Sequence, residues 1–315
     1  MLKLDFVRGH MGGNLIIILQ GSQLPPGQEL ETAIKVLGPH YMPAHEACIV
    51  YPAESPPVVM IKVAEPVSCC YISACGGATQ VLGAALVETD LGVQFGVENK
   101  TAMTEVLLST DCGLIPLKIE TADGKAVRIK TCMDSFVREC YERGVGKRRY
   151  AGVEVMQSGK FLVVNADRFR EVFPWADFKK WDKRTRDKLS EIQHEFQVDS
   201  GEMEYNVTLY DWNPASGGDA RVVFPHSLKD NYIEPSCGTG TVALGIAVLA
   251  CGELFPGSGN NNDKLVTLKI ESGGTNELGG PDVTVLDLEI ASGLVQSATF
   301  SHSRVEITAV GEVWV

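Results

Sequence analysis

Two segments of this chain, about half its length apart, repeat one pattern: a cysteine, a glycine, further small residues and then a long apolar stretch. The segments are Cys75-Gly76-Gly77-Ala78-Thr79 and Cys237-Gly238-Thr239-Gly240-Thr241. Apolar stretches of this length, bounded by glycine, predict a buried helix over 76–87 and another over 239–251. Because short strands separated by glycine-rich turns surround both helices, we predict that the chain contains a diverged duplication.

The duplication also predicts the fold class. Each copy holds strands, then Cys-Gly, then an apolar helix, then more strands, which is typical of an α+β unit. We expect two similar lobes, each with a curved, mainly antiparallel sheet around a central helix, related by a pseudo-twofold axis. A chain of 315 residues is long enough for two domains. We predict the first lobe at 1–148 and the second at 149–299, with a C-terminal strand (300–315) that can rejoin the first. A polar amphipathic helix at 175–196 is expected to cover the second lobe.

Composition limits the partners that the chain can have. Forty acidic and 28 basic residues give a net charge of −12, which repels phosphate backbones and anionic lipids. The apolar runs are shorter than the roughly 20 residues of a membrane-spanning helix, and no signal peptide opens the chain. Nine cysteines, an odd number, indicate free thiols in a reducing compartment. We therefore expect a cytoplasmic protein that binds neither nucleic acid nor membrane. Exposed sheet edges are compatible with a homodimer.

The two Cys-Gly helix starts favour the binding of a small anion. Small residues leave the first backbone amides of a helix bare, and these amides and the helix dipole attract a carboxylate. The same field favours a thiolate over a thiol, so we expect a lowered pKa for cysteine at this position. A single Cys-Gly is more often ordinary close packing. Two of them, in corresponding positions, reverse that preference.

A pair of such cysteines is suited to one reaction. Removing the α-proton of an amino acid without pyridoxal phosphate leaves negative charge, which amides bound to the carboxylate stabilise. One thiolate takes the proton on one face while the opposing thiol donates to the other, and the centre inverts. We therefore predict that Cys75 and Cys237 are the acid/base residues of a reaction that needs no cofactor and no metal.

At these residues the chain resembles the proline racemase family, which includes the hydroxyproline epimerases and belongs to the diaminopimelate epimerase-like superfamily. The resemblance covers nearly the whole chain and is most specific at the second cysteine motif. The other matching segments, in chain order, are His10-x-x-Gly13, 24–27, Cys75-Gly76-x-Ala78-Thr79, 113–115, 123–125, 135–137, 158–161, Gly252-Glu253-Leu254 and 271–275.

The resemblance implies a function and a set of site residues. It implies a racemase or epimerase of amino acids, with Cys75 and Cys237 as the acid/base pair. Both cysteines are present here, whereas the related dehydratases keep only one of the two. The residues implied to supply carboxylate-binding amides are Gly76, Gly77, Ala78, Gly238, Thr239 and Gly240.

The departures from the family pattern concern the substrate. Gly77 stands where the family usually has histidine, and Ile233 stands where it has aspartate. Those two residues hold the substrate amine in the family, so proline or hydroxyproline is in doubt. Glu234, one position further on, can take the amine role, although a solvated loop carboxylate is an equal alternative. Near the start, Asn14 replaces a glutamate of the family.

The glycine turn near the start of the chain is a further candidate for contact with the substrate. It holds Asn14 and, in the same turn, His10, although a lone histidine in such a turn is more often structural. Two other readings stay open. One is an allylic isomerase or dehydratase on the same fold, using one cysteine as base. The other is a catalytically silent amino-acid-binding protein, which the missing amine contacts favour.

Overall fold

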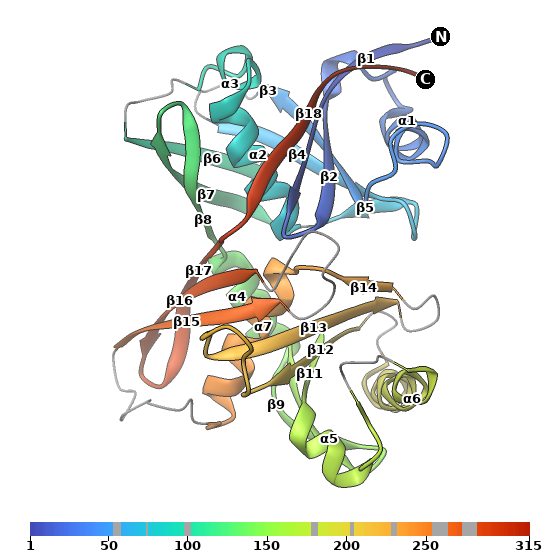
Figure 1. Cartoon of the computed structure of the whole chain (residues 1–315), viewed down its shortest axis with the longest axis vertical. Coiled ribbons are helices and arrows are strands. Elements are labelled where there is room, and N and C mark those ends of the chain that lie inside the picture. The colour runs from blue at the N-terminus through green and yellow to red at the C-terminus, as the bar shows by residue number, and fades with distance from the viewer. Residues whose placement is uncertain are drawn as a thin grey trace. The chain divides into compact units, whose positions relative to one another are not determined.

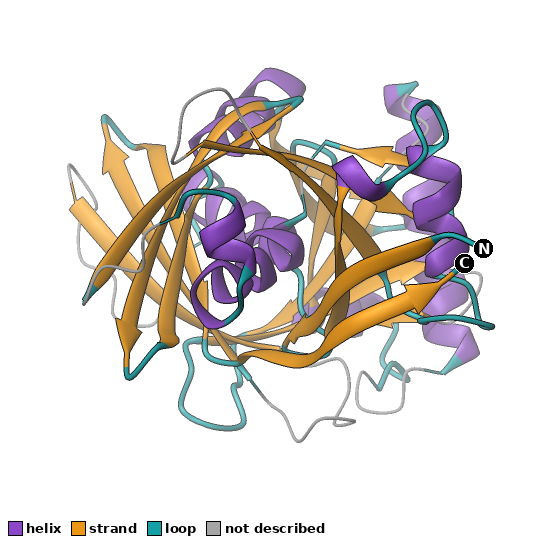
Figure 2. Cartoon of the chain, turned by 90° about the horizontal axis from the view of Figure 1, so that it is seen from above, coloured by secondary structure: helices purple, strands orange, loops and turns teal. Residues whose placement is uncertain are grey.

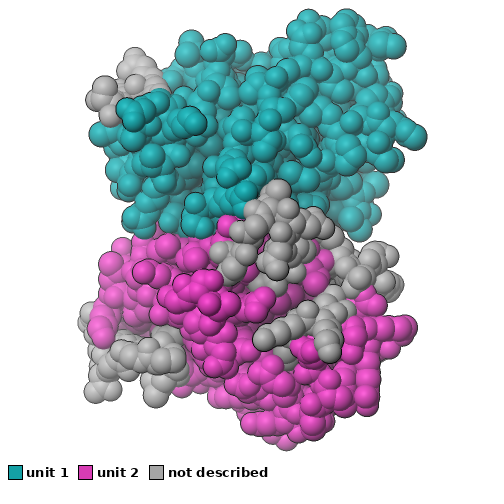
Figure 3. All heavy atoms as spheres, in the orientation of Figure 1, with its two compact units in different colours: residues 1–135, 301–315 teal, residues 136–300 magenta. Residues whose placement is uncertain are grey.

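The computed structural model describes residues 1–52, 58–73, 75–97, 102–177, 182–201, 205–227, 232–253, 264–272 and 282–315. These residues form two compact units, coloured separately in Figure 3. Unit 1 comprises Met1–Ser135 with Ser301–Val315, and unit 2 comprises Phe136–Phe300. The C-terminal strand thus belongs to the first unit. The boundary falls after Ser135 rather than at 148, because 145–150 form a hairpin with 153–158 of unit 2.

Unit 1 is a curved sheet around one helix, with a second helix on the outer face. Its elements are β1 (Lys3–Met11), β2 (Asn14–Gln20), the 3₁₀ turn η1 (Gly21–Gln23), α1 (Glu29–Val36), β3 (Glu46–Pro52), β4 (Val58–Glu65), β5 (Cys70–Ile72), α2 (Gly76–Glu88), α3 (Leu91–Gln94), β6 (Met103–Thr110), β7 (Gly113–Ala122), β8 (Lys125–Cys132) and β18 (Val305–Trp314). The strands pair in the order β18-β1-β2-β3-β4-β6-β7-β8. Only β2–β3 and β4–β6 are parallel among these pairs.

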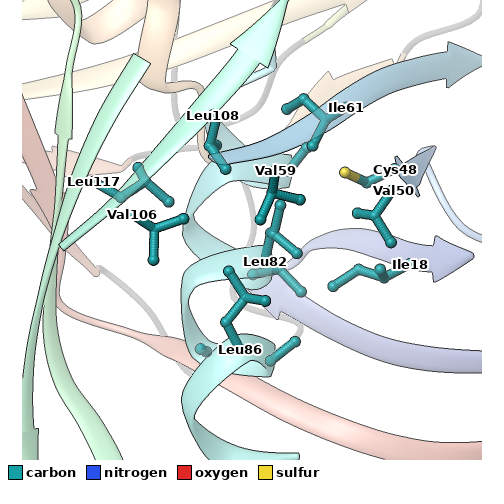
Figure 4. Packing of buried hydrophobic residues seen from close by; sticks show 14 of the residues in the cluster. Ile18, Cys48, Val50, Val59, Ile61, Leu82, Leu86, Val106, Leu108 and Leu117 are labelled. Carbon is teal, nitrogen blue, oxygen red and sulfur yellow. The ribbon is translucent and has the colours of Figure 1, made fainter. Parts of the chain in front are cut away.

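The helix α2 forms the centre of unit 1 because most of its residues, on all sides, are apolar or small, and such a helix is stable only when it is surrounded. All residues from Gly76 to Val87 are buried, as predicted from the sequence. Strands curve around a central helix in the view of Figure 2. Leu82 and Leu86 of α2 face strand residues such as Val59 and Leu108 in Figure 4.

Alternation along the strands of unit 1 separates two hydrophobic layers. In β2, Ile16 and Ile18 pack with α2, whereas Ile17 and Leu19 pack with the layer under α1. Successive side chains of a strand point to opposite faces, so this sheet is apolar on both sides. The continuous apolar run at 15–19 is the sequence signature of such a buried strand.

Unit 2 repeats the same topology. Its elements are α4 (Asp134–Arg143), β9 (Val145–Tyr150), β10 (Val153–Ser158), β11 (Phe161–Asn165), α5 (Ala166–Val172), α6 (Lys183–Ser200), β12 (Asn206–Asp211), β13 (Ala220–Ser227), β14 (Tyr232–Glu234), α7 (Gly238–Ala250), β15 (Lys264–Ser272), β16 (Val283–Ala291) and β17 (Leu294–His302). The strands pair in the order β9-β10-β11-β12-β13-β15-β16. The parallel pairs, β11–β12 and β13–β15, match β2–β3 and β4–β6 of unit 1.

The correspondence between the two units confirms the predicted α+β class. In each unit a hairpin leads to a helical crossover, a parallel strand, an antiparallel strand, a short strand and then the central helix (Figure 1). The predicted amphipathic helix at 175–196 is α6, which begins at Lys183 because Asp182 caps it by accepting a hydrogen bond from Thr185 N (2.8 Å). Residues 178–181 of that prediction, Leu254 and the segment 273–275 lie outside the described residues.

Candidate active site

The first turns of α2 and α7 have nearly the same geometry. Cys75 is the N-cap of α2 with φ −138° and ψ 118°, and Cys237 is the N-cap of α7 with φ −129° and ψ 111°. The Sγ atom of Cys75 accepts a hydrogen bond from Ala78 N (3.3 Å), and that of Cys237 accepts one from Gly240 N (3.4 Å). Each sulfur therefore lies at the amino end of a 13-residue helix, against its free amides.

Glycine is required in the first turn of α7 because aromatic rings pack against the backbone there. A Cβ atom at Gly238 would lie 2.6 Å from the Phe300 ring, and one at Gly240 would lie 2.7 Å from the Phe224 ring. Real Cβ atoms do not approach other heavy atoms so closely. The glycines predicted to expose amides are thus also needed for packing within unit 2.

The first turn of α2 is packed against a polar side chain instead. A Cβ atom at Gly77 would lie 3.0 Å from Asn14 Nδ2 and 3.4 Å from Ile16 Cδ1. Asn14 is completely buried, and its Oδ1 lies 3.0 Å from Nδ1 of His45. Two departures from the family pattern therefore meet in space, since Asn14 occupies the room that a side chain at 77 would need.

The Cys237 thiol lies beside an acidic and a hydroxyl side chain. Its Sγ is 3.3 Å from Thr239 Oγ1, and the Glu234 carboxyl interacts with the thiol. Burial, followed by the Glu234 charge, raises the pKa of this thiol well above its usual range, although Thr239 and the Gly240 amide oppose the shift. The predicted lowering of the pKa is therefore wrong for Cys237, because desolvation and a like charge outweigh the helix amides.

A pocket lies beside Cys75 within unit 1. Its lining residues come from β4, from β5 and the residue after it, from the start of α2, and from β6, β7 and the turn between them. They are Ile61, Lys62, Val63, Ile72, Ser73, Cys75, Thr79, Thr110, Asp111 and Ile115. Cys75 is 8% exposed, whereas Ser73 and Asp111 are exposed. The pocket therefore runs from an exposed polar rim to a buried thiol.

The glycine turn between β1 and β2 places His10 in a local network. His10 is buried, its Nδ1 accepts a hydrogen bond from Gly13 N (3.4 Å), and its Nε2 is 3.3 Å from Glu306 Oε2. These contacts support the structural interpretation of His10 that the sequence already favoured.

Sequence reasoning missed a buried polar network that holds α2. Gln80 donates to Ile129 O (3.0 Å) and Thr131 Oγ1 (2.8 Å), and its Oε1 accepts from His302 N (3.3 Å). His45, beside Asn14, was also missed. The neighbouring carboxyl of Glu46, likewise missed, is buried at the start of β3, opposite Ile16 of β2. No local pattern marks these residues, because each partner is distant in the sequence.

The described residues offer no group of three or more His, Cys, Asp or Glu side chains that could hold a metal ion. None of the described helices is long and apolar enough to cross a membrane. The remaining described cysteines have no disulfide partner. Burial raises the pKa of both Cys48 and Cys140 to about 12, as expected of thiols in packing positions.

The chain matches no protein-family model, and no curated protein matches its sequence. Its fold is similar to several solved structures. The hydroxyproline epimerase from Agrobacterium vitis with bound trans-4-OH-L-proline aligns over 99% of this chain and 92% of its own, with 14% identity and a TM-score of 0.67. The methylitaconate-delta-isomerase aligns over 98% and 95%, with 16% identity and a TM-score of 0.64. A Bacillus anthracis phenazine biosynthesis protein of the PhzF family aligns over the full length of both chains, with 12% identity and a TM-score of 0.63.

These similarities confirm the predicted fold class across the whole length of the chain. At this level of identity they concern the fold alone, since one fold hosts several chemistries. The proteins with this fold include a hydroxyproline epimerase and a methylitaconate-delta-isomerase, so the fold by itself does not select one reaction.

Proposed function

We propose that this chain is a cofactor-independent racemase or epimerase that inverts the α-carbon of an amino acid, with Cys75 and Cys237 as its two acid/base residues. The observation that carries the proposal is the matched pair of helix starts. In each unit a cysteine caps an apolar central helix. Its Sγ accepts a hydrogen bond from the backbone amide three residues later, at 3.3 Å for Cys75 and 3.4 Å for Cys237. Structural similarity to an epimerase supports the same reaction.

The helix amides supply the electrostatic part of the mechanism. A substrate carboxylate at a helix start accepts hydrogen bonds from amides that no intrahelical carbonyl uses. When the α-proton leaves as H⁺, the electron pair of the C–H bond moves into the carboxylate, which gains charge. The amides then bind the transition state more strongly than the ground state, which lowers the barrier.

The thiols supply the proton transfers. In one direction the Cys75 thiolate takes the α-proton, and the Cys237 thiol gives its proton to the opposite face of the carbon. In the other direction the roles exchange. The raised pKa of Cys237 suits the donor role in the first direction, because it favours the protonated thiol before the substrate binds.

Isotope exchange tests the proposal directly. Incubation of the protein with single enantiomers of cyclic and linear amino acids in deuterium oxide should place deuterium on the α-carbon and produce the other enantiomer. The double variant Cys75→Ser with Cys237→Ser should lose both signals, while Cys112→Ser, at an exposed turn, should keep them. Absence of exchange for every amino acid with the unaltered protein would contradict the proposal.

A double-bond isomerase or a dehydratase is the second candidate, favoured by the similarity to the methylitaconate-delta-isomerase. Such an enzyme would move a double bond, or expel a leaving group, with one cysteine as base. Product analysis separates the cases, since a shifted or new alkene changes the ultraviolet spectrum whereas an enantiomer does not. A silent binding protein would give a calorimetric binding signal with an amino acid and no exchange over hours.

A further inference from the structure

The side chain of Thr239 contacts the sulfur of Cys237. Thr239 is the second residue of α7, and its Oγ1 lies 3.3 Å from Sγ of Cys237. A helical side chain points back toward the amino end of its helix, so a threonine at this position reaches the residue that caps the helix. The Gly240 amide donates to the same sulfur at 3.4 Å. One helical turn therefore brings both a hydroxyl and an amide to the Cys237 thiol.

The first turn of α2 carries a glycine where α7 carries Thr239. This residue is Gly77, two positions after Cys75. A Cβ atom at Gly77 would already lie 3.0 Å from Nδ2 of the buried Asn14, so a threonine there would require Asn14 to move. The two thiols therefore differ in the side chains that their own helices offer them, although the backbones of the two helix starts match.

The groups around Cys237 act on its charge in opposite directions. Burial raises the pKa of the thiol most, the negative charge of Glu234 on β14 raises it further, and Thr239 and the Gly240 amide lower it. The uncharged side chains that other strands of unit 2 pack on this turn are Phe224, Phe300 and Thr208. Because burial and a like charge both oppose a thiolate at Cys237, that thiolate depends on the donors of its own helix.

We propose that Thr239 is a positioning residue of the reaction, whose hydroxyl donates a hydrogen bond to Sγ of Cys237 when this sulfur is a thiolate. This inference rests on the proposed function. When Cys237 gives its proton to the α-carbon, the sulfur keeps the electron pair of the S–H bond and becomes negative. Thr239 keeps its own proton and turns it toward the sulfur. A hydrogen bond to a charged group is stronger than one to a neutral group, so this contact strengthens as the charge develops and lowers the barrier.

The contact serves both directions of the reaction. The Cys237 thiolate is formed in one direction, where the thiol is the acid, and is the reactant in the other, where it is the base. A catalyst does not change the equilibrium between two enantiomers, so loss of the contact must lower kcat/KM by the same factor for both. A residue that only bound the side chain of the substrate would not change the pH dependence of the free thiol.

The experiment removes the hydroxyl of Thr239 and keeps its shape. Thr239→Val is compared with Thr239→Ser, which retains a hydroxyl, and with Thr241→Val. The Thr241 hydroxyl donates to the backbone oxygen of Cys237 (2.7 Å), so this control removes a hydroxyl of the same helix without removing the contact with Sγ. Thermal melting checks folding, and Thr239→Ala replaces Thr239→Val if the valine variant does not fold.

Two measurements are made on each variant. The first is the rate at which iodoacetamide alkylates Cys237 as a function of pH, followed by peptide mass spectrometry, with Cys75 as the internal reference. It needs no substrate and reports the pKa of the thiol. The second is kcat/KM for both enantiomers of each amino acid whose α-proton exchanges with deuterium oxide.

For Thr239→Val we expect about tenfold slower alkylation of Cys237 at pH 8, which corresponds to a rise of about one unit in its pKa, and about a tenfold fall in kcat/KM for both enantiomers. Thr239→Ser should restore most of both, Thr241→Val should behave as the unaltered protein, and alkylation of Cys75 should not change.

Unchanged alkylation of Cys237 in Thr239→Val, or an equal slowing in Thr241→Val, would overturn the role of Thr239. Exchange of α-protons by the unaltered protein would still support the proposed function in that case. If the unaltered protein exchanges no α-proton, the proposed function fails, and with it the role of Thr239 in the reaction, whatever the alkylation rates are.

Discussion

The starts of α2 and α7 share a backbone but differ in their surroundings. The two N-cap cysteines have φ and ψ values within 10° of each other and accept a hydrogen bond from the amide three residues later. Around Cys75 lie aliphatic residues and a pocket, whereas Glu234 and Thr239 lie next to Cys237. The comparison shows that the two copies of the helix start have kept the same capping geometry, while the side chains around the two thiols have become different.

The bodies of the two helices differ as well. Five residues after the cysteine, α2 carries Gln80, which bonds to Thr131 and His302, whereas α7 carries the fully buried Val242. The helix of unit 1 is therefore fixed by polar contacts in addition to apolar packing. A buried polar network of this kind gives a helix one defined position.

The largest expected effect separates the roles of the two thiols. Cys75→Ser and Cys237→Ser should each lower the rate of racemisation by about 10²–10⁴, the usual contribution of a general acid or base. If each thiol serves one face, each variant should still exchange the α-proton of one enantiomer, and the two variants should prefer opposite enantiomers. Chiral chromatography with mass detection in deuterium oxide measures both. Loss of the same enantiomer's exchange in both variants would mean that the thiols do not serve opposite faces.

The second prediction concerns the buried imidazole of His302 in unit 1. Burial lowers the pKa of His302 to about 4 from an ordinary value of 6.5, so the folded state holds this ring neutral. The unfolded chain binds a proton first as pH falls, so the His302 contribution to stability is complete above pH 6.5 and is lost as pH falls toward 4. The free energy of unfolding should fall by up to about 3 kcal/mol through this group. In His302→Gln the fall between pH 7 and pH 4.5, measured by urea unfolding, should be smaller. The control variant His40→Gln, at an exposed site, should lose as much stability between pH 7 and pH 4.5 as the unaltered protein. If His302→Gln also loses that much, His302 is not the cause of the loss.

The third prediction concerns the packing of the two first turns. Gly240→Ala places a methyl group 2.7 Å from the buried Phe224 ring, so we expect a destabilisation of about 1–3 kcal/mol. Gly77→Ala meets Asn14 Nδ2 at 3.0 Å and needs a shift of only a few tenths of an ångström, so its cost should be smaller. Urea unfolding of both variants measures the difference. Equal costs would show that the amide of Asn14 is as rigid as the phenyl ring.

The smallest effect concerns the pKa of one thiol. Glu234→Gln removes a negative charge beside Cys237, so the pKa of that thiol should fall, and its alkylation by iodoacetamide at pH 8 should become faster. Alkylation of Cys75, followed in the same samples by peptide mass spectrometry, should not change. An unchanged rate at Cys237 would mean that burial alone raises its pKa.

Much of the fold could be predicted from the sequence because its signals are local. The apolar stretches after Cys75 and Cys237 specify helices that need a surrounding sheet, and small residues specify bare amides at their starts. The alternation and turn residues of β6, β7 and β8 specify hairpins. The start of α6 was less well predicted, because the cap at Asp182 and the aromatic residues before it give competing signals.

The sequence by itself determined the duplication, the two central helices and the capping cysteines, since each depends on residues within one or two turns of each other. Only the tertiary structure decided what surrounds each thiol. Thr110 and Ile61 reach the pocket of Cys75 from β6 and β4, which pair in the sheet, and His302 reaches Gln80 from the other end of the chain. Contacts of this kind join residues of large sequence separation, so no period or local motif marks them. The pKa of the Cys237 thiol likewise depends first on burial, which tertiary packing sets, and only then on the nearby Glu234.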